Sequence, residues 1–204
     1  MNPQDDVAAA LAPVKAAFHK LGVRHYVGGS VASSFHGAAR STMDVDLVAE
    51  LTETQVTEFL NCFQGDFYVS EVAVRDAIRR KSCFSLIHFA TSFKDDVFIS
   101  QGRPFDISAM QRATIEQLGD GQVVEIAVAT AEDAIISKLE WYRKTNETSG
   151  RQWDDVTRLL KLLRDNADFG YLEKSAQSVG VSDLYERLLS EVYPRIGTDQ
   201  GPKG

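Results

Sequence analysis

Two aspartates, Asp44 and Asp46, lie two residues apart in the segment DVDLVA at residues 44–49. The segment has the alternating pattern of a half-buried strand, in which every second side chain points to the same side. Both carboxylates therefore share one face, where they repel each other unless a cation lies between them. A hard divalent ion such as Mg²⁺ takes oxygen ligands and bridges carboxylates to phosphates. The spacing predicts a metal site for a phosphorylated ligand.

Gly28, Gly29 and Ser30 lie about fifteen residues earlier, directly after a short strand predicted at residues 24–27. Glycines let a backbone approach a ligand closely, and the start of a helix, which Ser30 is predicted to cap, favours an anion. A phosphate-binding turn is thus predicted beside the metal-binding strand. Each motif also has an ordinary alternative, a solvated pair of acids and a plain turn respectively.

The hydrophobic pattern predicts the elements that position these residues. Helices are predicted at residues 7–21, 30–35, 52–63 and 71–81, and strands at 24–27, 44–49, 67–69, 83–90, 93–100 and 123–129. The strands at 83–90 and 93–100 are so close in sequence that they must form an antiparallel hairpin. The rest of the chain is predicted to be helical, at residues 131–144, 150–164, 168–179 and 182–192, and Thr130 and Ser149 occupy capping positions.

This order of elements predicts two parts, an α+β domain at residues 1–129 and a helical domain at residues 130–204. The composition is that of a folded protein, because 44% of the residues are hydrophobic. The start MNPQDD lacks the features of a secretory signal, and no segment has the roughly 20 apolar residues that span a bilayer. We expect a cytoplasmic protein without membrane contact.

The 22 Lys and Arg residues are outnumbered by 29 Asp and Glu residues, which gives a formal net charge of −7. Binding of nucleic acid over the whole surface is not expected, because it requires concentrated positive charge. A local basic patch is still compatible with this charge. The sequence offers one in the predicted helix 71–81, which carries Arg75, Arg79, Arg80 and Lys81.

The segment VGGSVASSFHGAARSTMDVDLV, residues 27–48, resembles the first motif of the polymerase-β-type nucleotidyltransferase superfamily. FKDDVFIS at residues 93–100 resembles the strand that carries the third metal carboxylate in that family, and RPFD at 103–106 resembles the segment after it. EDAIISKLEWYRK together with SGRQWDD resembles the helical signature of bacterial nucleotidyltransferases related to AbiEii-type toxins. The resemblance covers about residues 25–160. It implies a nucleotidyltransferase palm, a mixed β-sheet flanked by helices, followed by a C-terminal helical domain.

The resemblance also implies site residues. Its catalytic, metal-binding carboxylates correspond to Asp44, Asp46 and Asp96, which would hold Mg²⁺ or Mn²⁺. Its nucleotide-binding positions correspond to Gly28, Gly29, Ser30, Arg40 and Lys138. The implied reaction is an in-line attack of an acceptor on the α-phosphate of a nucleoside triphosphate, with pyrophosphate as leaving group.

Several assignments have alternatives. Asp95 and Asp96 are neighbours that face opposite ways, and strand parity alone leaves both open as the third carboxylate. The family pattern selects Asp96 and makes Asp95 a solvated neighbour. Arg40 fits a structural role in its loop as well as a substrate role, and Lys138 fits a lysine that extends from a half-buried helix to solvent. Asp154 and Asp155, beside Trp153, fit a structural role in which they join their helix to the core.

The predicted function is Mg²⁺-dependent transfer of a nucleoside monophosphate to RNA, tRNA or a protein. The AbiEii-like resemblance makes a toxin with a cognate antitoxin one version of this function. An antibiotic-modifying nucleotidyltransferase is a second enzyme hypothesis. The alternatives from other classes are a noncatalytic nucleotide-binding module with the same fold and, less well matched, a glycosyltransferase with an Asp-x-Asp metal site.

Overall fold

A computed structural model describes residues 3–38, 42, 44–63, 65–121 and 123–194. The first part of the chain alternates helices and strands: α1 (Pro3–Lys20), β1 (His25–Val27), α2 (Gly29–Phe35), β2 (Asp44–Ala49), a 3₁₀ turn at Glu53–Gln55, α3 (Val56–Asn61), β3 (Phe67–Val69), α4 (Glu71–Arg80), β4 (Cys83–His88), β5 (Lys94–Ile99), α5 (Pro104–Arg112), β6 (Thr114–Leu118) and β7 (Val124–Val128). Helices follow to the end: α6 (Ala131–Lys144), α7 (Gly150–Leu163), a 3₁₀ turn at Arg164–Asn166, α8 (Phe169–Val179) and α9 (Ser182–Val192).

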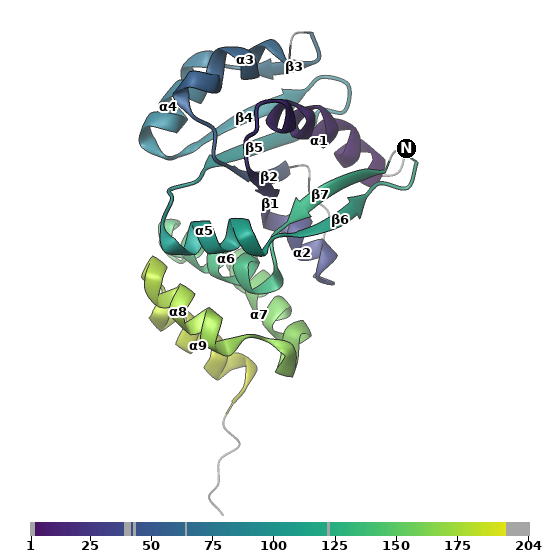
Figure 1. Ribbon diagram of the computed structural model, residues 1–204. Coiled ribbons are helices and arrows are strands. Elements are labelled where there is room, and N and C mark those ends of the chain that lie inside the picture. Colours follow the sequence, from purple (N-terminus) through teal and green to yellow (C-terminus); the bar gives the residue numbers. More distant parts are fainter. Residues whose placement is uncertain (1–2, 39–41, 43, 64, 122, 195–204) are drawn as a thin grey trace, which may run out of the picture.

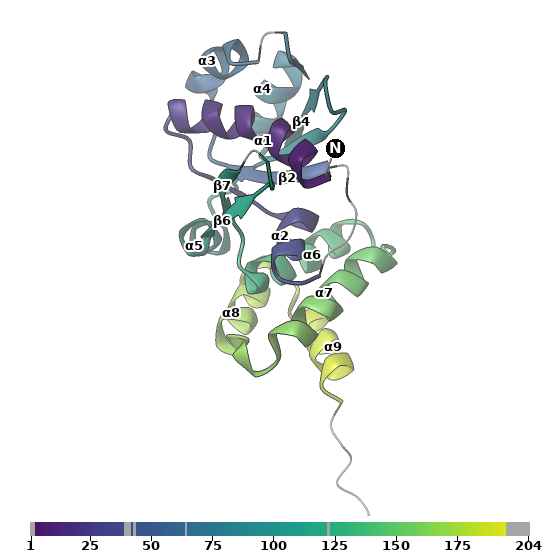
Figure 2. The ribbon, with the colours of Figure 1, turned by 90° about the vertical axis from the view of Figure 1, so that its right-hand side faces the viewer.

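The strands of the described chain form one mixed seven-stranded sheet in the order β3-β4-β5-β2-β1-β7-β6. β2 lies antiparallel to β1 and parallel to β5, and β4 and β5 form the predicted antiparallel hairpin. The helices lie in layers on both sides of the sheet, with α1, α3 and α4 on one side and α2, α5 and α6 on the other (Figure 1). α7, α8 and α9 pack beneath that second layer (Figure 2). The predicted α+β class is confirmed.

The core has one apolar layer on each side of the sheet. On one side, the rings of Phe18 and Phe59 stack at 5.4 Å, and Phe59 meets Phe84 edge-on at 5.8 Å. On the other side, α2 packs on β2 and on α6. At the rim of this layer, Phe98 meets the partly exposed Trp141 edge-on at 5.7 Å. Burial of such rings is a major source of stability, on the order of 2 kcal/mol for each fully buried side chain.

Most predicted elements are found close to their expected bounds. The strand at 44–49 and the helices at 131–144 and 182–192 match the structure, and the Thr130 and Ser149 hydroxyls accept the backbone N–H groups of Asp133 and Gln152 as predicted. α1 starts earlier than expected, at Pro3, because a proline fits the first turn of a helix without loss of a hydrogen bond.

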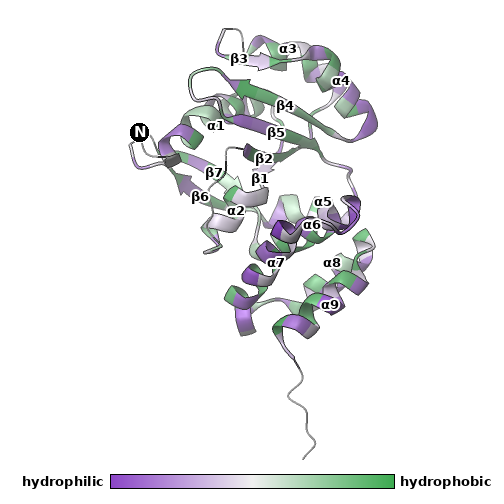
Figure 3. Cartoon of the chain, turned by 180° about the vertical axis from the view of Figure 1, so that it is seen from behind, coloured by the Kyte–Doolittle hydropathy of each residue, from purple (hydrophilic) through white to green (hydrophobic). Residues whose placement is uncertain are grey.

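Two elements, α5 and β6, were not predicted. α5 starts at Pro104, and the Asp106 side chain accepts the backbone N–H of Arg103, which closes the first turn. β6 is an edge strand in which only Leu118 is buried, so its sequence lacks the alternation of a half-buried strand. Figure 3 shows the contrast between the largely hydrophobic β4 and the hydrophilic β6.

Ion pairs join α5 to α6 on the side of the sheet that α2, α5 and α6 cover. The Arg103 guanidinium, at the end of the β5–α5 connection, donates to Asp106 on α5 and to Glu140 on α6. Hydrogen bonds to these two carboxylates raise the pKa of Arg103, so its guanidinium stays positively charged. This contact fixes α6 relative to the end of β5. Within the described chain, none of the helices combines the length and the apolar character required to cross a bilayer.

Candidate active site

Asp46 and Asp96 lie opposite each other on neighbouring parallel strands. In the register of β2 and β5, Asp46 pairs with Asp96 and Asp44 pairs with Lys94. Paired residues of adjacent strands point to the same side of a sheet, so these four side chains share one face. The parallel pairing therefore brings together three carboxylates from segments that lie about fifty residues apart in the sequence.

The Lys94 ammonium group bridges two of these carboxylates. Its Nζ lies 2.8 Å from Asp96 Oδ2 and 3.6 Å from Asp44 Oδ1. The hydrogen bond with Asp96 raises the pKa of Lys94 and keeps it positively charged. The ammonium thus relieves the repulsion that the three carboxylates would otherwise exert on one another.

The Asp46 side chain lies against the glycine turn. A Cβ placed on Gly29 would be 2.5 Å from Asp46 Cγ, and the backbone N–H of Ser30 donates to the Asp46 carboxylate. Burial raises the pKa of Asp46, and Asp96 raises it further, whereas the charge of Lys138 and the Ser30 hydrogen bond lower it. Asp46 is therefore a carboxylate whose negative charge is poorly compensated by its surroundings.

The glycine turn is built as expected in outline, but its cap differs. α2 begins at Gly29, and the capping position is Gly28, so the prediction that Ser30 caps the helix was wrong. Gly29 has a φ of +56°, in the region that favours glycine, which lets the chain turn directly from β1 into α2. Ser30 is buried within the first helical turn, next to Asp46.

Asp95 lies on the opposite side of the sheet from Asp96. It is 0% exposed, with Val97 and Ile99 on the face against which α1 and α4 pack. Neither of its carboxylate oxygens has a hydrogen-bond partner in the described chain. Burial raises the pKa of Asp95 to about 7. The prediction of a solvated neighbour was therefore wrong: Asp95 is a buried carboxyl group in the core, which explains why it cannot face Asp46.

Ser85 is a site neighbour that the sequence analysis did not identify. It lies opposite Asp96 in the register of the β4–β5 hairpin, and its hydroxyl donates to Asp96 Oδ1 at 2.5 Å. Asp96 is thus held from both sides, by Lys94 and by Ser85. The predicted hairpin contained the signal, because its register determines which β4 residue faces Asp96.

Lys138 reaches the site from α6 but is held by an acid. Its side chain is 5% exposed, and Nζ donates to Asp155 Oδ2 on α7 at 2.7 Å. Its positive charge still lowers the pKa of Asp46, which places it near the carboxylates. The alternative of a lysine that extends to solvent does not apply. Asp155, expected to be a structural tie, is the residue that positions Lys138.

The remaining predicted site residue is Arg40. Arg40 lies outside the described residues. The Thr42 hydroxyl donates to the backbone oxygen of Asp44 at 3.1 Å, so Thr42 supports the start of β2.

The donor set has the chemistry of a site for a hard divalent ion, because it consists of carboxylate oxygens. In the described part of the chain, however, no three His, Cys, Asp or Glu side chains converge as a metal-binding group. Asp44 and Asp96 turn toward Lys94, and Asp46 turns toward the Ser30 N–H. Lys94 therefore supplies the positive charge between Asp44 and Asp96 in this structure.

No protein-family model and no curated protein matches the sequence. Solved structures do match the fold. ANT(2'')-Ia in complex with adenylyl-2''-tobramycin is similar over 87% of this chain and 97% of its own, with a TM-score of 0.51 and 10% identity. The chain has the nucleotidyltransferase fold.

A second structure with the nucleotidyltransferase fold is an antigenic nucleotidyltransferase-like protein from Paracoccidioides brasiliensis. It is 18% identical and covers 92% of this chain and 95% of its own, with a TM-score of 0.48. At these identities the likeness concerns the fold, and the chemistry must be argued from the residues. The fold places Asp44, Asp46 and Asp96 on one face, beside the glycine turn and beneath α6.

Proposed function

We propose that the protein is a metal-dependent nucleotidyltransferase. It would join the nucleoside monophosphate part of a nucleoside triphosphate to an acceptor and release pyrophosphate. The observation that carries this proposal is the pairing of Asp46 with Asp96 across β2 and β5, with Asp44 beside them and the glycine turn against Asp46.

Asp44, Asp46 and Asp96 are the residues that would hold Mg²⁺ or Mn²⁺. When bound, such ions neutralise the phosphate oxygens and stabilise the charge that develops during an in-line displacement. The raised pKa of Asp46 and the bridge through Lys94 support this assignment, because both indicate carboxylates crowded enough to require a cation.

The other residues would bind and orient the nucleotide. Gly28, Gly29 and Ser30 would form the phosphate-binding turn through the Gly29 backbone and the Ser30 hydroxyl, because the N–H groups of Gly28 and Ser30 are bonded to Asp46. Arg40 would contribute positive charge. Lys138, fixed by Asp155, would provide a positive charge beside the triphosphate. Such positioning is most of what phosphoryl transfer asks of a protein.

Asp96 would face the acceptor hydroxyl. In the reaction, the acceptor oxygen would bond to the α-phosphorus, the bond from this phosphorus to the pyrophosphate oxygen would break, and Asp96 would take up the hydroxyl proton. Ser85 supports this role because its hydrogen bond keeps Asp96 on the site face.

We further propose, from the motif resemblance alone, that the chain is related to AbiEii-type nucleotidyltransferases. This relation makes RNA or a protein the acceptor and a cognate antitoxin a partner. A small antitoxin-like reading frame next to the gene would support it.

The test is transfer of label from each of four α-labelled nucleoside triphosphates to a cell extract in the presence of Mn²⁺. We expect the wild type to label one class of macromolecule and Asp46→Asn and Asp96→Asn to lose the activity, by about 100-fold or more, since each weakens the binding of the metal ions that would stabilise the transition state. Asp95→Asn is the matched control, because its side chain faces the opposite layer of the core, and it should keep the activity.

Two outcomes would contradict the proposal. One is a wild type that binds no nucleotide in calorimetry with Mg²⁺ or Mn²⁺. The other is an Asp46→Asn variant that folds normally by circular dichroism and transfers label as well as the wild type does.

A further inference from the structure

The outer face of α7 carries a basic cluster that the sequence analysis did not identify. Arg158, Lys161 and Arg164 are all exposed, whereas α7 buries Val156, Leu159 and Leu160 on its inner side. Together with Asp154, Thr157 and Leu162 the three cations line a cavity of about 800 Å³. We call this cavity the α7 groove.

The cations of the α7 groove are not neutralised within the described chain. None of the three has an ion-pair partner among the described residues, and Asp154 is the one acid among the lining residues named above. The cluster on α4 differs, because each of its arginines meets an acid. Arg75 pairs with Glu71 and Glu53, and Arg79 and Arg80 both pair with Asp76.

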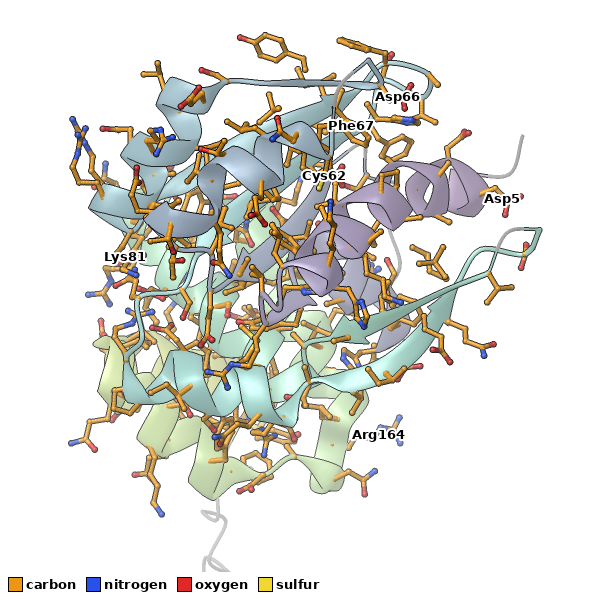
Figure 4. The ribbon with its side chains drawn as sticks, turned by 45° about the horizontal axis from the view of Figure 1, so that its top comes forward. Asp5, Cys62, Asp66, Phe67, Lys81 and Arg164 are labelled. Carbon is orange, nitrogen blue, oxygen red and sulfur yellow. The ribbon has the colours of Figure 1, made fainter. Side chains whose placement is uncertain are left out.

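This difference decides which cluster is available to a polyanion. A cation that is already paired must give up its acid before it can bind a phosphate, whereas an unpaired one exchanges only small counterions. The two clusters are also separate in space, since Lys81 at the end of α4 and Arg164 at the end of α7 project on opposite sides of the molecule (Figure 4). Binding of an anion to the α7 groove therefore breaks no ion pair of the described chain, whereas binding to the α4 arginines does.

The α7 groove begins close to the candidate active site. Asp155, which holds Lys138 beside Asp46, precedes Arg158 by less than one helical turn. At its other end, Leu162 lies at van der Waals distance from a Cβ placed on Gly37, just beyond α2. A ligand chain lying along the α7 groove would thus reach the edge of the site.

The spacing fits a sugar-phosphate backbone. Arg158 and Arg164 are six residues apart, which is about 9 Å along the helix axis, or two to three stacked nucleotides at about 3.4 Å each. The lining residues named above include no aromatic side chain on which a base could stack. Contacts of this kind position a nucleic acid without reading its sequence.

We propose that the α7 groove binds the phosphate backbone of a single-stranded polynucleotide, which is the acceptor of the reaction. The inference rests on the proposed nucleotidyltransferase function and selects nucleic acid over protein as its acceptor. The net charge of −7 agrees with a grip confined to one groove.

The test is fluorescence anisotropy with a labelled single-stranded RNA of mixed sequence and the full chain at 0.05 to about 0.3 M salt. We expect Arg158→Gln with Lys161→Gln to weaken binding about 25-fold at 0.1 M salt, about fivefold for each lost phosphate contact, and to reduce the salt slope by about 1.4. The matched control, Arg79→Gln with Arg80→Gln, removes the same charge from α4 and should change the affinity less than about twofold. Both pairs are exposed, so both variants should fold.

The outcomes separate the groove from the enzyme. Equal weakening by the α4 and α7 variants, or no binding by the wild type, would overturn the inference. The same holds if inorganic triphosphate displaces the RNA completely at equal charge concentration, since the α7 groove would then be a nucleotide subsite. A single-stranded DNA of the same sequence tells whether the ribose hydroxyl contributes. Asp46→Asn should leave RNA binding intact. A wild type that binds RNA but transfers no label would contradict the proposed function and not the groove. A wild type that labels protein and binds no RNA would contradict the groove and not the proposed function.

Discussion

The Asp46 carboxylate lies directly against the backbone of Gly29. A Cβ at position 29 would be 2.5 Å from Asp46 Cγ and 2.8 Å from Asp46 Cβ, distances that real side chains do not tolerate. The first glycine of the turn is different, because a Cβ on Gly28 would meet its nearest neighbours at 4.0 Å. One glycine of the pair is therefore required by the Asp46 side chain and the other is not.

Gly29→Ala should consequently damage both the fold and the site. We expect a loss of about 2 kcal/mol or more in the free energy of unfolding, because the new methyl group displaces Asp46 and the φ of +56° is unfavourable for alanine. Gly28→Ala is the matched control and should cost less than half as much. Urea unfolding of both variants measures the difference, and equal losses would refute the assigned contact.

The Lys94 bridge predicts competition between an ammonium group and a divalent ion. Lys94→Met should bind Mn²⁺ about fivefold more tightly, which corresponds to about 1 kcal/mol for a partly exposed pair, because the ion no longer competes with the lysine. Calorimetry without nucleotide measures this affinity. Lys174→Met, which removes an exposed lysine from α8, controls for the change in net charge. Weaker Mn²⁺ binding by Lys94→Met would mean that the lysine supports the metal site.

Replacement of the buried Asp95 by a neutral residue should stabilise the protein, and the size of this gain should depend on pH. Burial raises the pKa of Asp95 to about 7 in the folded protein from an ordinary value of 3.8, so folding favours the protonated form and becomes less favourable as the pH rises through this range. Asp95→Asn should have little effect near pH 3.5. Above pH 7 it should stabilise the protein, with an upper limit on the order of 4 kcal/mol.

Thermal unfolding of Asp95→Asn between pH 4 and about 8 tests this prediction. Asp66→Asn serves as the control, because Asp66 is exposed. A variant that loses stability above pH 7 would show that the Asp95 carboxylate has a partner in solution.

The Lys138–Asp155 pair predicts a large cost for breaking a buried ion pair. Asp155→Asn removes the carboxylate that the buried Lys138 ammonium contacts directly, and we expect the free energy of unfolding to fall by about 3 kcal/mol. The exposed pair of Arg143 and Asp183 offers a comparison, since Asp183→Asn should cost less than about 1 kcal/mol. A double variant, Lys138→Met with Asp155→Leu, should recover most of the loss. If it does not, the pair contributes more than charge balance.

The sequence could predict the features that depend on residues close together in the chain. The shared face of Asp44 and Asp46 follows from the two-residue period of a strand, and the Thr130 cap follows from the first turn of a helix, so both were predicted correctly. The glycine turn was located, but its cap was assigned to Ser30 because Gly28 and Ser30 are both acceptable at that position.

What it could not predict depends on distant segments. Whether Asp95 or Asp96 faces Asp46 is decided by the pairing of β5 with β2 and by the helices on the other side, and no local pattern contains that information. The contact of Lys138 with Asp155 likewise arises from the packing of α6 on α7. β6 was overlooked because an edge strand needs no apolar alternation.

Under the proposed function, the Lys94 bridge would also govern the electrostatic field that an approaching nucleotide meets. The three carboxylates and the ammonium have a formal charge of −2, so at long range the site repels a free triphosphate. A nucleoside triphosphate that carries one divalent ion would arrive with about half of its negative charge cancelled, and it would bring a cation to replace Lys94 among the carboxylates. The order of arrival would thereby be biased toward the metal complex of the nucleotide, and the rate of association should rise with ionic strength more steeply for the free nucleotide than for the complex.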